Sequence, residues 1–153
     1  MFIDHLGVAV RSLEKGIENW ERQFGYRRAT EPVINTRQMV RVVFMEKEGS
    51  LPIKLVEPTG PTSPVFPFVQ KGGGLHHVCF RLGDLDQSIE ALREQGGRVL
   101  APPQPGEAFD DEPIAFVLAQ PGLNVELIAT DKRRGRIQPS SDDETNGTTA
   151  IPR

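Results

Sequence analysis

Residues 4–28, DHLGVAVRSLEKGIENWERQFGYRR, occur a second time in altered form as residues 76–100, HHVCFRLGDLDQSIEALREQGGRVL. The two segments align without a gap at an offset of 72 residues (76 minus 4), which places His5 on His77 and Gly25 on Gly97. The same offset places residues 42–57 on residues 114–129. Agreement of two separate blocks at one offset indicates two modules of equal length and the same fold.

Each module has the same order of elements. The segments 2–10 and 75–82 have the composition of strands, and a helical stripe of apolar residues follows each of them. Ser12 and Asp84 are suitable caps before these helices, and Gly25 and Gly97 fall where the helices are expected to end. Three shorter strands follow in each module, near residues 27–32, 40–46 and 52–57, and near residues 98–101, 113–119 and 124–130. The pattern βαβββ, used twice, favours an α+β protein with an antiparallel or mixed sheet and helices on one face.

Composition sets the domain boundaries. We expect one domain over residues 1–130, with modules 1–58 and 75–130 and a Pro- and Gly-rich linker, residues 59–74, that contains one short helical turn. Residues 131–153 have few apolar residues and no periodicity, which predicts a disordered tail. The KRRGR motif at residues 132–136 is then solvated, with a basic recognition patch as the alternative.

The overall charge and composition exclude several classes of partner. The 153 residues carry a net charge of −3, which argues against nucleic acid or an anionic membrane as the main partner. The chain holds no apolar run long enough to span a bilayer. Its single cysteine, Cys79, excludes an internal disulfide and fits a reducing compartment, so we expect a cytoplasmic protein.

Together with the paired modules, the motifs DHLGVAV (4–10), GLHHVCF (74–80) and NVELIA (124–129) resemble the vicinal oxygen chelate superfamily, and most of all its methylmalonyl-CoA epimerase-like members. The resemblance implies one curved, mixed, eight-stranded sheet with the helices on its outer face, cupped around a divalent metal, and a homodimer. It also implies ligands from the first and last strand of each module. In this sequence those positions are His5, Lys54, His77 and Glu126.

The ligand positions make chemical sense in part. His5, His77 and Glu126 are residue types that bind Zn, Co, Ni, Mn or Fe. Lys54 has no free electron pair while it is protonated, so the metal is expected to be weak or absent. Because neighbouring residues of a strand point to opposite faces, the repeat predicts that His77 faces the cup and that His76, aligned with Asp4, faces away.

The residue that would act as a second base also departs from the resemblance. Epimerisation next to a thioester carbonyl needs a base on each face of the carbon, and the expected carboxylate position in the loop holds Arg37. Glu126 is one catalytic candidate, and Asp110, which aligns with Gln38, is the candidate for the other base. The candidate substrate-binding residues are Arg37, Gln38, Lys54 and Phe109.

Three functions follow as hypotheses. The first is a metal-dependent isomerase or epimerase that acts through an enolate on a small acyl thioester or 2-oxo compound. The second is a non-catalytic protein that binds an antibiotic or an acyl metabolite, which the residues Lys54 and Arg37 favour. The third is an Fe(II) extradiol-type dioxygenase, against which the expected orientation of His76 argues, because such enzymes use a further histidine in the pocket.

Overall fold

The structure is a computed structural model that describes residues 1–138; residues 139–153 of the expected tail lie outside the described residues. The first module holds β1 (Phe2–Ala9), α1 (Leu13–Phe24), β2 (Arg27–Arg28), β3 (Val33–Asn35), β4 (Val40–Glu46) and β5 (Ile53–Pro58). The linker holds α2 (Phe66–Gln70). The second module holds β6 (Gly74–Arg81), α3 (Leu85–Glu94), β7 (Arg98–Gly106), the 3-10 turn η1 (Glu107–Phe109), β8 (Glu112–Gln120) and β9 (Leu123–Ile128).

The expected helix caps are present. The Ser12 hydroxyl accepts a hydrogen bond from the Lys15 backbone N–H, and the Asp84 carboxylate accepts one from Gln87 N–H. Gly25 ends α1 in the left-handed conformation, at φ 70°. α3 ends earlier than expected, at Glu94, and Gly96 rather than Gly97 has a positive φ.

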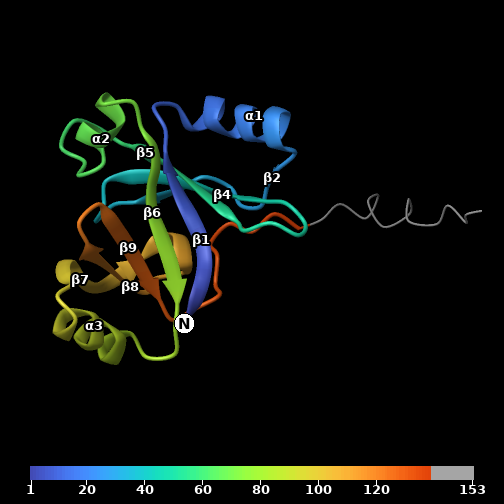
Figure 1. Ribbon diagram of the computed structural model, residues 1–153. Helices are drawn as coiled ribbons and strands as arrows, with labels where there is room; N and C mark the ends of the chain where they lie inside the picture. The colour runs from blue at the N-terminus through green and yellow to red at the C-terminus, as the bar shows by residue number, and fades with distance from the viewer. Residues whose placement is uncertain (139–153) are drawn as a thin grey trace, which may run out of the picture.

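The two modules repeat in strand register as well as in sequence. β1 pairs in parallel with β5, Leu6 opposite Ile53, and β6 pairs in parallel with β9, Val78 opposite Val125, which is the same pairing 72 residues later. The antiparallel β1–β6 pair joins the modules into one curved mixed sheet of order β2-β4-β5-β1-β6-β9-β8-β7 (Figure 1). The predicted fold class is confirmed, and the short strand β3, which pairs with β4, is added to the eight expected strands.

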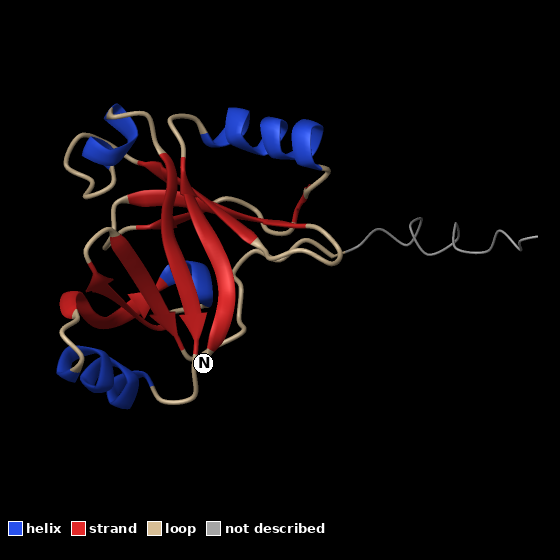
Figure 2. Ribbon diagram, in the orientation of Figure 1, coloured by secondary structure: helices blue, strands red, loops and turns tan. Residues whose placement is uncertain are grey.

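Hydrophobic clusters lie on both faces of the sheet. α1 and α3 lie at the two ends of the outer face, one over each module (Figure 2). Under α1, Leu13 packs with Met45 and Leu55, and under α3, Ile89 packs with Leu127. The concave face encloses a third cluster, which includes Phe44, Phe109, Ile114 and, from α2, Val69. This concave side is the cup in which the site lies.

Residues 131–138 differ from the expected disordered tail, because they pack against both modules. We call them the C-terminal strap. Ile137 N–H donates to the Ala29 carbonyl, Glu31 N–H donates to the Gly135 carbonyl, and Arg134 N–H donates to the Ala108 carbonyl. Backbone hydrogen bonds and ion pairs hold the strap, and neither leaves an apolar pattern in the sequence.

Within residues 1–138, no helix is both long enough and apolar enough to cross a membrane.

Candidate metal and substrate site

Three side chains converge inside the cup, from three different strands. His5 comes from β1, His77 from β6 and Glu126 from β9, and all three are buried. Glu126 Oε1 lies 3.0 Å from His5 Nε2 and 3.8 Å from His77 Nε2. Among the described residues none of these three atoms has a hydrogen-bond partner of good geometry. A bound cation requires several electron-pair donors directed at it. Buried donor atoms that lie close together and make no hydrogen bond fit this requirement.

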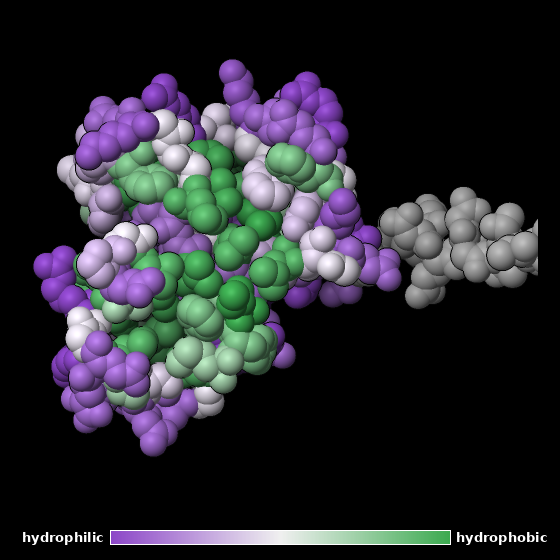
Figure 3. All heavy atoms as spheres, viewed as in Figure 1, coloured by the Kyte–Doolittle hydropathy of each residue, from purple (hydrophilic) through white to green (hydrophobic). Residues whose placement is uncertain are grey.

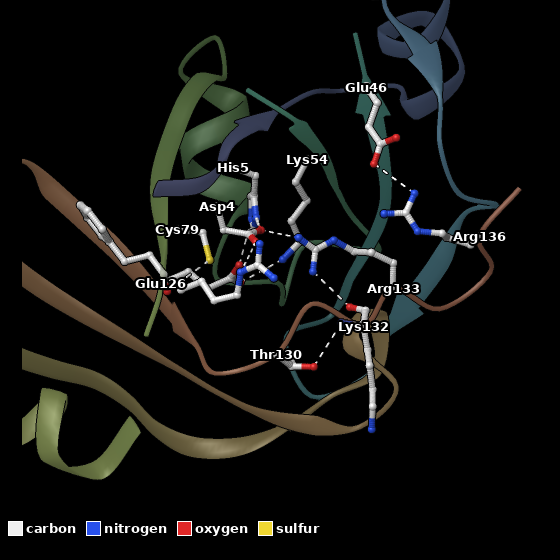
Figure 4. Close-up of polar contacts among 12 residues, drawn as sticks. Asp4, His5, Glu46, Lys54, Cys79, Glu126, Thr130, Lys132, Arg133 and Arg136 are labelled. Carbon is white, nitrogen blue, oxygen red and sulfur yellow. Dashed lines mark hydrogen bonds and ion pairs between the residues drawn. The ribbon is translucent and has the colours of Figure 1, made fainter. Parts of the chain in front are cut away.

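Lys54 occupies the other oxygen of the same carboxylate. Its Nζ donates to Glu126 Oε2 at 2.9 Å, and the lysine side chain is 2% exposed (Figure 4). Burial alone would raise the pKa of Glu126, but the charge of Lys54, together with His5 and His77, brings that pKa well below its ordinary value. Glu126 is therefore a carboxylate with Lys54 at one oxygen and an open position, beside His5 and His77, at the other.

The two residues that precede the ligand histidines also turn toward the cup, which corrects the expectation for His76. In the β1–β6 ladder Ile3 pairs with Phe80 and His5 with Cys79, so Asp4 is an extra residue in β1. Farther along, Gly7 pairs with His77 and Val8 with Leu75, so His76 is an extra residue in β6. Such β-bulges break the alternation of side chains. They occur at equivalent positions of the two modules, 4 and 76.

The bulge at Asp4 gives His5 a carboxylate partner. Asp4 Oδ2 lies 2.7 Å from His5 Nδ1, and Arg81 Nε lies 3.3 Å from Asp4 Oδ1. Burial would raise the pKa of Asp4, but the hydrogen bond of His5 and the charges of Arg133 and Arg81 outweigh it, and the pKa lies below its ordinary value. Because an ionised carboxylate only accepts, His5 Nδ1 carries a proton that it donates to Asp4, and Nε2 is the ring atom that faces Glu126 and the site.

The bulge at His76 gives His77 a partner of its own. The two Nδ1 atoms are 2.9 Å apart, so one ring donates a proton and the other accepts it. Burial lowers the pKa of both histidines, that of His77 farther. Both rings are therefore neutral at pH 7, and neutral imidazole is the form that binds a metal.

A second group of possible ligands fits a metal less well. Asp4, His5 and Cys79 also lie close together. Burial and the charge of Glu126 raise the pKa of Cys79, so this residue stays a thiol rather than the thiolate that binds metals. The carboxylate of Asp4 already serves His5 and two arginines.

A pocket of about 330 Å³ opens onto the cluster. Lys54, His76 and His77 line it, together with the predicted residues Arg37 and Gln38. Two polar residues that the sequence did not suggest, Gln104 and Asn124, also line it. The apolar part of the wall is made by Val40, Val56, Pro64, Val65, Leu100, Ala101 and Phe116.

Two predicted site residues lie elsewhere. Phe109 is fully buried beneath the site, with its ring 4.9 Å from Lys54 Nζ, and does not line the pocket. Asp110 follows η1 at the surface, where it pairs with Arg134 of the strap at 3.3 Å. Asp110 therefore lies outside the pocket, because it follows the η1 turn at the surface and pairs with the strap.

Fold and site together define a member of a known superfamily. The Glyoxalase/Bleomycin resistance protein/Dioxygenase superfamily profile matches residues 4–116, and the chain belongs to this superfamily. Among its relatives, a mitochondrial methylmalonyl-CoA epimerase of Dictyostelium discoideum is 28% identical over 129 residues, 82% of this chain and 76% of that protein.

Solved structures give the same picture. The methylmalonyl-CoA epimerase of Mycobacterium tuberculosis superimposes with a TM-score of 0.74 at 30% identity, over 83% of this chain and 86% of that one. A methylmalonyl-CoA epimerase in complex with methylmalonyl-CoA and NH4+ has a TM-score of 0.73 at 27% identity, over 84% and 94% of the two chains.

Proposed function

We propose that the protein is an isomerase of the epimerase type that moves a proton at the carbon next to the carbonyl of a small acyl-CoA thioester. The observation that carries the proposal is the pocket that ends on Lys54, His76 and His77, with the Glu126 carboxylate directly behind them. Relatives and structural neighbours named as methylmalonyl-CoA epimerases support the acyl-CoA class.

The residues that would hold a divalent metal are His5, His77 and Glu126. The three unpartnered atoms Nε2, Nε2 and Oε1 fit such an ion. When bound, the metal would act as a Lewis acid toward the thioester carbonyl.

The side chains around the pocket supply the remaining functions. The Lys54 ammonium faces the pocket at its inner end and stabilises negative charge that develops on the carbonyl oxygen. Arg37 is suited to an anionic group of the substrate, such as a carboxylate or phosphate. Within residues 1–138, no Asp or Glu lines the pocket, so the proton acceptors that it offers are the imidazole of His76 and, behind the surface, Glu126.

Exchange of the proton for deuterium tests the proposal. Purified protein, with Co²⁺ or Zn²⁺ added, is incubated in D2O with a panel that includes methylmalonyl-CoA, ethylmalonyl-CoA and propionyl-CoA. We expect deuterium at the carbon next to the carbonyl of at least one thioester, and loss of this exchange in His77→Ala. Absence of exchange across the whole panel contradicts the proposal.

A second candidate, a protein that binds an acyl metabolite without chemistry, is favoured by one observation. The Lys54–Glu126 ion pair already neutralises the carboxylate that would otherwise serve catalysis. Thermal stabilisation by an acyl-CoA without deuterium exchange supports this candidate.

The orientation of His76 no longer argues against a dioxygenase, because this residue lines the pocket. Oxygen consumption with catechols and Fe(II) tests that alternative. We expect none, because the relatives reported above are epimerases.

We further infer that two copies of the chain pair through the outer face of the sheet. The outward residues of the central strands form three apolar cross-strand pairs, Ile3–Phe80, Leu6–Val78 and Val8–Leu75. Leu75 is 65% exposed and Ile3 39%, and an apolar band runs between the two polar helices α1 and α3 (Figure 3). An apolar face with polar rims is complementary to itself, which suits a two-fold dimer.

A further inference from the structure

The KRRGR motif of the strap pairs with acidic residues on both modules. Lys132 Nζ lies 2.5 Å from Glu112, Arg134 lies 2.8 Å from Asp111, and Arg136 lies 3.1 Å from Glu46. These three ion pairs are exposed, with 37% to 55% of the basic side chains accessible, and such pairs contribute little to stability. The motif is therefore neither a free basic patch nor a solvated tail.

Arg133 differs from the other basic residues of the motif, because its side chain is only 8% exposed. Its guanidinium pairs with Asp4 Oδ2. It also lies over two aromatic rings of the cup, 4.4 Å from the centroid of Phe44 and 5.0 Å from that of Phe109. The strap thus places one buried, fixed cation inside the molecule.

Asp4, the partner of Arg133, is connected to the site through His5. Asp4 accepts the His5 Nδ1 proton, His5 Nε2 faces Glu126 Oε1, and Glu126 Oε2 accepts from Lys54. Figure 4 shows Asp4, His5, Lys54, Glu126 and Arg133 gathered in one cluster. Carboxylates that accept the second N–H of a ligand histidine fix its tautomer and ring orientation.

We propose that Arg133 is a positioning residue that acts through Asp4 to hold His5 with its proton on Nδ1 and its Nε2 electron pair toward the site. Without Arg133, the buried Asp4 carboxylate keeps the hydrogen bond of His5 and, among the described residues, one charged partner, Arg81 at 3.3 Å. Asp4 would then turn toward Arg81 or toward water, and His5 would populate both neutral tautomers. The metal part of this inference rests on the proposed function; the tautomer part does not.

The test compares Arg133→Met with Arg134→Met and Arg136→Met, which break ion pairs of the same strap without touching Asp4. The first readout is the ¹⁵N chemical shifts of the His5 ring in metal-free protein at pH 7.5. We expect a single Nδ1–H tautomer in the wild type and both control variants, and a mixture in Arg133→Met. The second is calorimetric titration with Co²⁺, in which we expect Arg133→Met to weaken binding by at least about tenfold and the controls to match the wild type.

Equal ring shifts in Arg133→Met and the wild type overturn the proposal, as does an equal loss of Co²⁺ affinity in all three variants. If the wild type binds no Co²⁺, the metal part of the proposed function fails, and the ring shifts still decide the role of Arg133. Arg133→Lys keeps the charge without the guanidinium fork and serves if Arg133→Met does not fold. In Arg133→Lys we expect a smaller fraction of the second His5 tautomer than in Arg133→Met. Wild-type ring shifts in Arg133→Lys would show that the positive charge alone is sufficient to hold Asp4 in place.

Discussion

Lys54 decides how the cup holds positive charge. Its ammonium and a divalent ion would share the single carboxylate of Glu126, one on each oxygen. Two cations this close repel each other, and in a buried site that repulsion is screened less than in water. The lysine therefore both competes with a metal and supplies, from the chain itself, part of the charge that a metal would bring.

Removal of that charge should strengthen metal binding. We expect Lys54→Gln to bind Zn²⁺, Co²⁺ or Ni²⁺ at least about tenfold more tightly than the wild type, about 1.4 kcal/mol in binding free energy. An amide keeps a hydrogen bond to Glu126, adds an oxygen ligand and relieves the repulsion. Calorimetric titration measures the difference, with the surface substitution Lys71→Gln as control. A wild type that binds as tightly as Lys54→Gln contradicts this account of Lys54.

Stability should fall on mild acidification. The pKa values of His76 and His77 lie below 6.5 in the folded protein, mainly because of burial, so below pH 6.5 the unfolded chain takes up protons that the folded chain does not. The free energy of unfolding should decrease from about pH 6.5 downward, with a limiting slope of about 1.4 kcal/mol per pH unit for each histidine. Urea unfolding at pH 7.5, 6.5 and 5.5 with a chelator measures this slope.

His76→Gln removes one of the two titrating groups and should give a shallower slope. His77→Gln would do the same but also disturbs the buried cluster. An unchanged slope in His76→Gln shows that this histidine is protonated equally in both states.

The candidate ligand residues could be predicted from the sequence, but the residues that orient them could not. The resemblance to the superfamily implies His5, Lys54, His77 and Glu126, and the repeat matches His5 with His77 and Lys54 with Glu126. Alternation along a strand then places Asp4 and His76 on the opposite face, which is wrong for both residues because each is bulged. A bulge depends on the register of the partner strand, and that register is not visible in the bulged segment.

The β1–β6 pair is the element on which the site depends most. It joins the modules, carries both candidate ligand histidines and contains both bulges. Gly7, opposite His77, lies against the histidine ring: a Cβ at this position would be 2.0 Å from His77 Cε1. The absence of a side chain on β1 therefore makes the space that the ligand ring of β6 occupies.

A methyl group at position 7 should displace that ring. We expect Gly7→Ala to lose roughly 1–3 kcal/mol of unfolding free energy, the usual cost of overpacking, and to lose detectable metal binding. Gly60→Ala is the matched control, because a Cβ there meets nothing within 4 Å. Urea unfolding and metal titration of both variants measure the effect. Wild-type stability in Gly7→Ala would show that His77 has another rotamer of equal energy.

At the level of elements, the repeat predicts more than local propensity does. The 72-residue offset predicts two equivalent modules, each with one long helix, and the structure adds that strand pairing repeats too, as Leu6–Ile53 and Val78–Val125. The short strand β3 and the strap were missed for different physical reasons, since β3 is too short to show the alternation of a strand and the strap depends on contacts that are distant in sequence. β3 pairs three residues, Val33, Ile34 and Asn35, with β4, and the strap is held by contacts to residues such as Glu46 and Asp4, far away in the sequence.

For the molecule as a whole, the two faces of the sheet have different surroundings. The concave face is closed by its own core, the strap and the pocket residues. The outer face is covered at its two ends by α1 and α3, and between them β1 and β6 expose Ile3 and Leu75 beside partly buried apolar residues. A contiguous apolar surface of this kind marks a protein interface more often than it marks a free surface.

Charge on that face should separate the two copies. We expect the wild type to sediment at twice the chain mass of 17.0 kDa, and Leu75→Glu to sediment as a monomer with nearly unchanged unfolding free energy, because Leu75 is 65% exposed and contributes little to its own core. Ile34→Glu, at another exposed apolar position, on β3, should remain dimeric. Equilibrium sedimentation from 1 to 100 μM separates these outcomes. A monomeric wild type across this range, or dimeric Leu75→Glu, would show that the β1–β6 face does not join two copies.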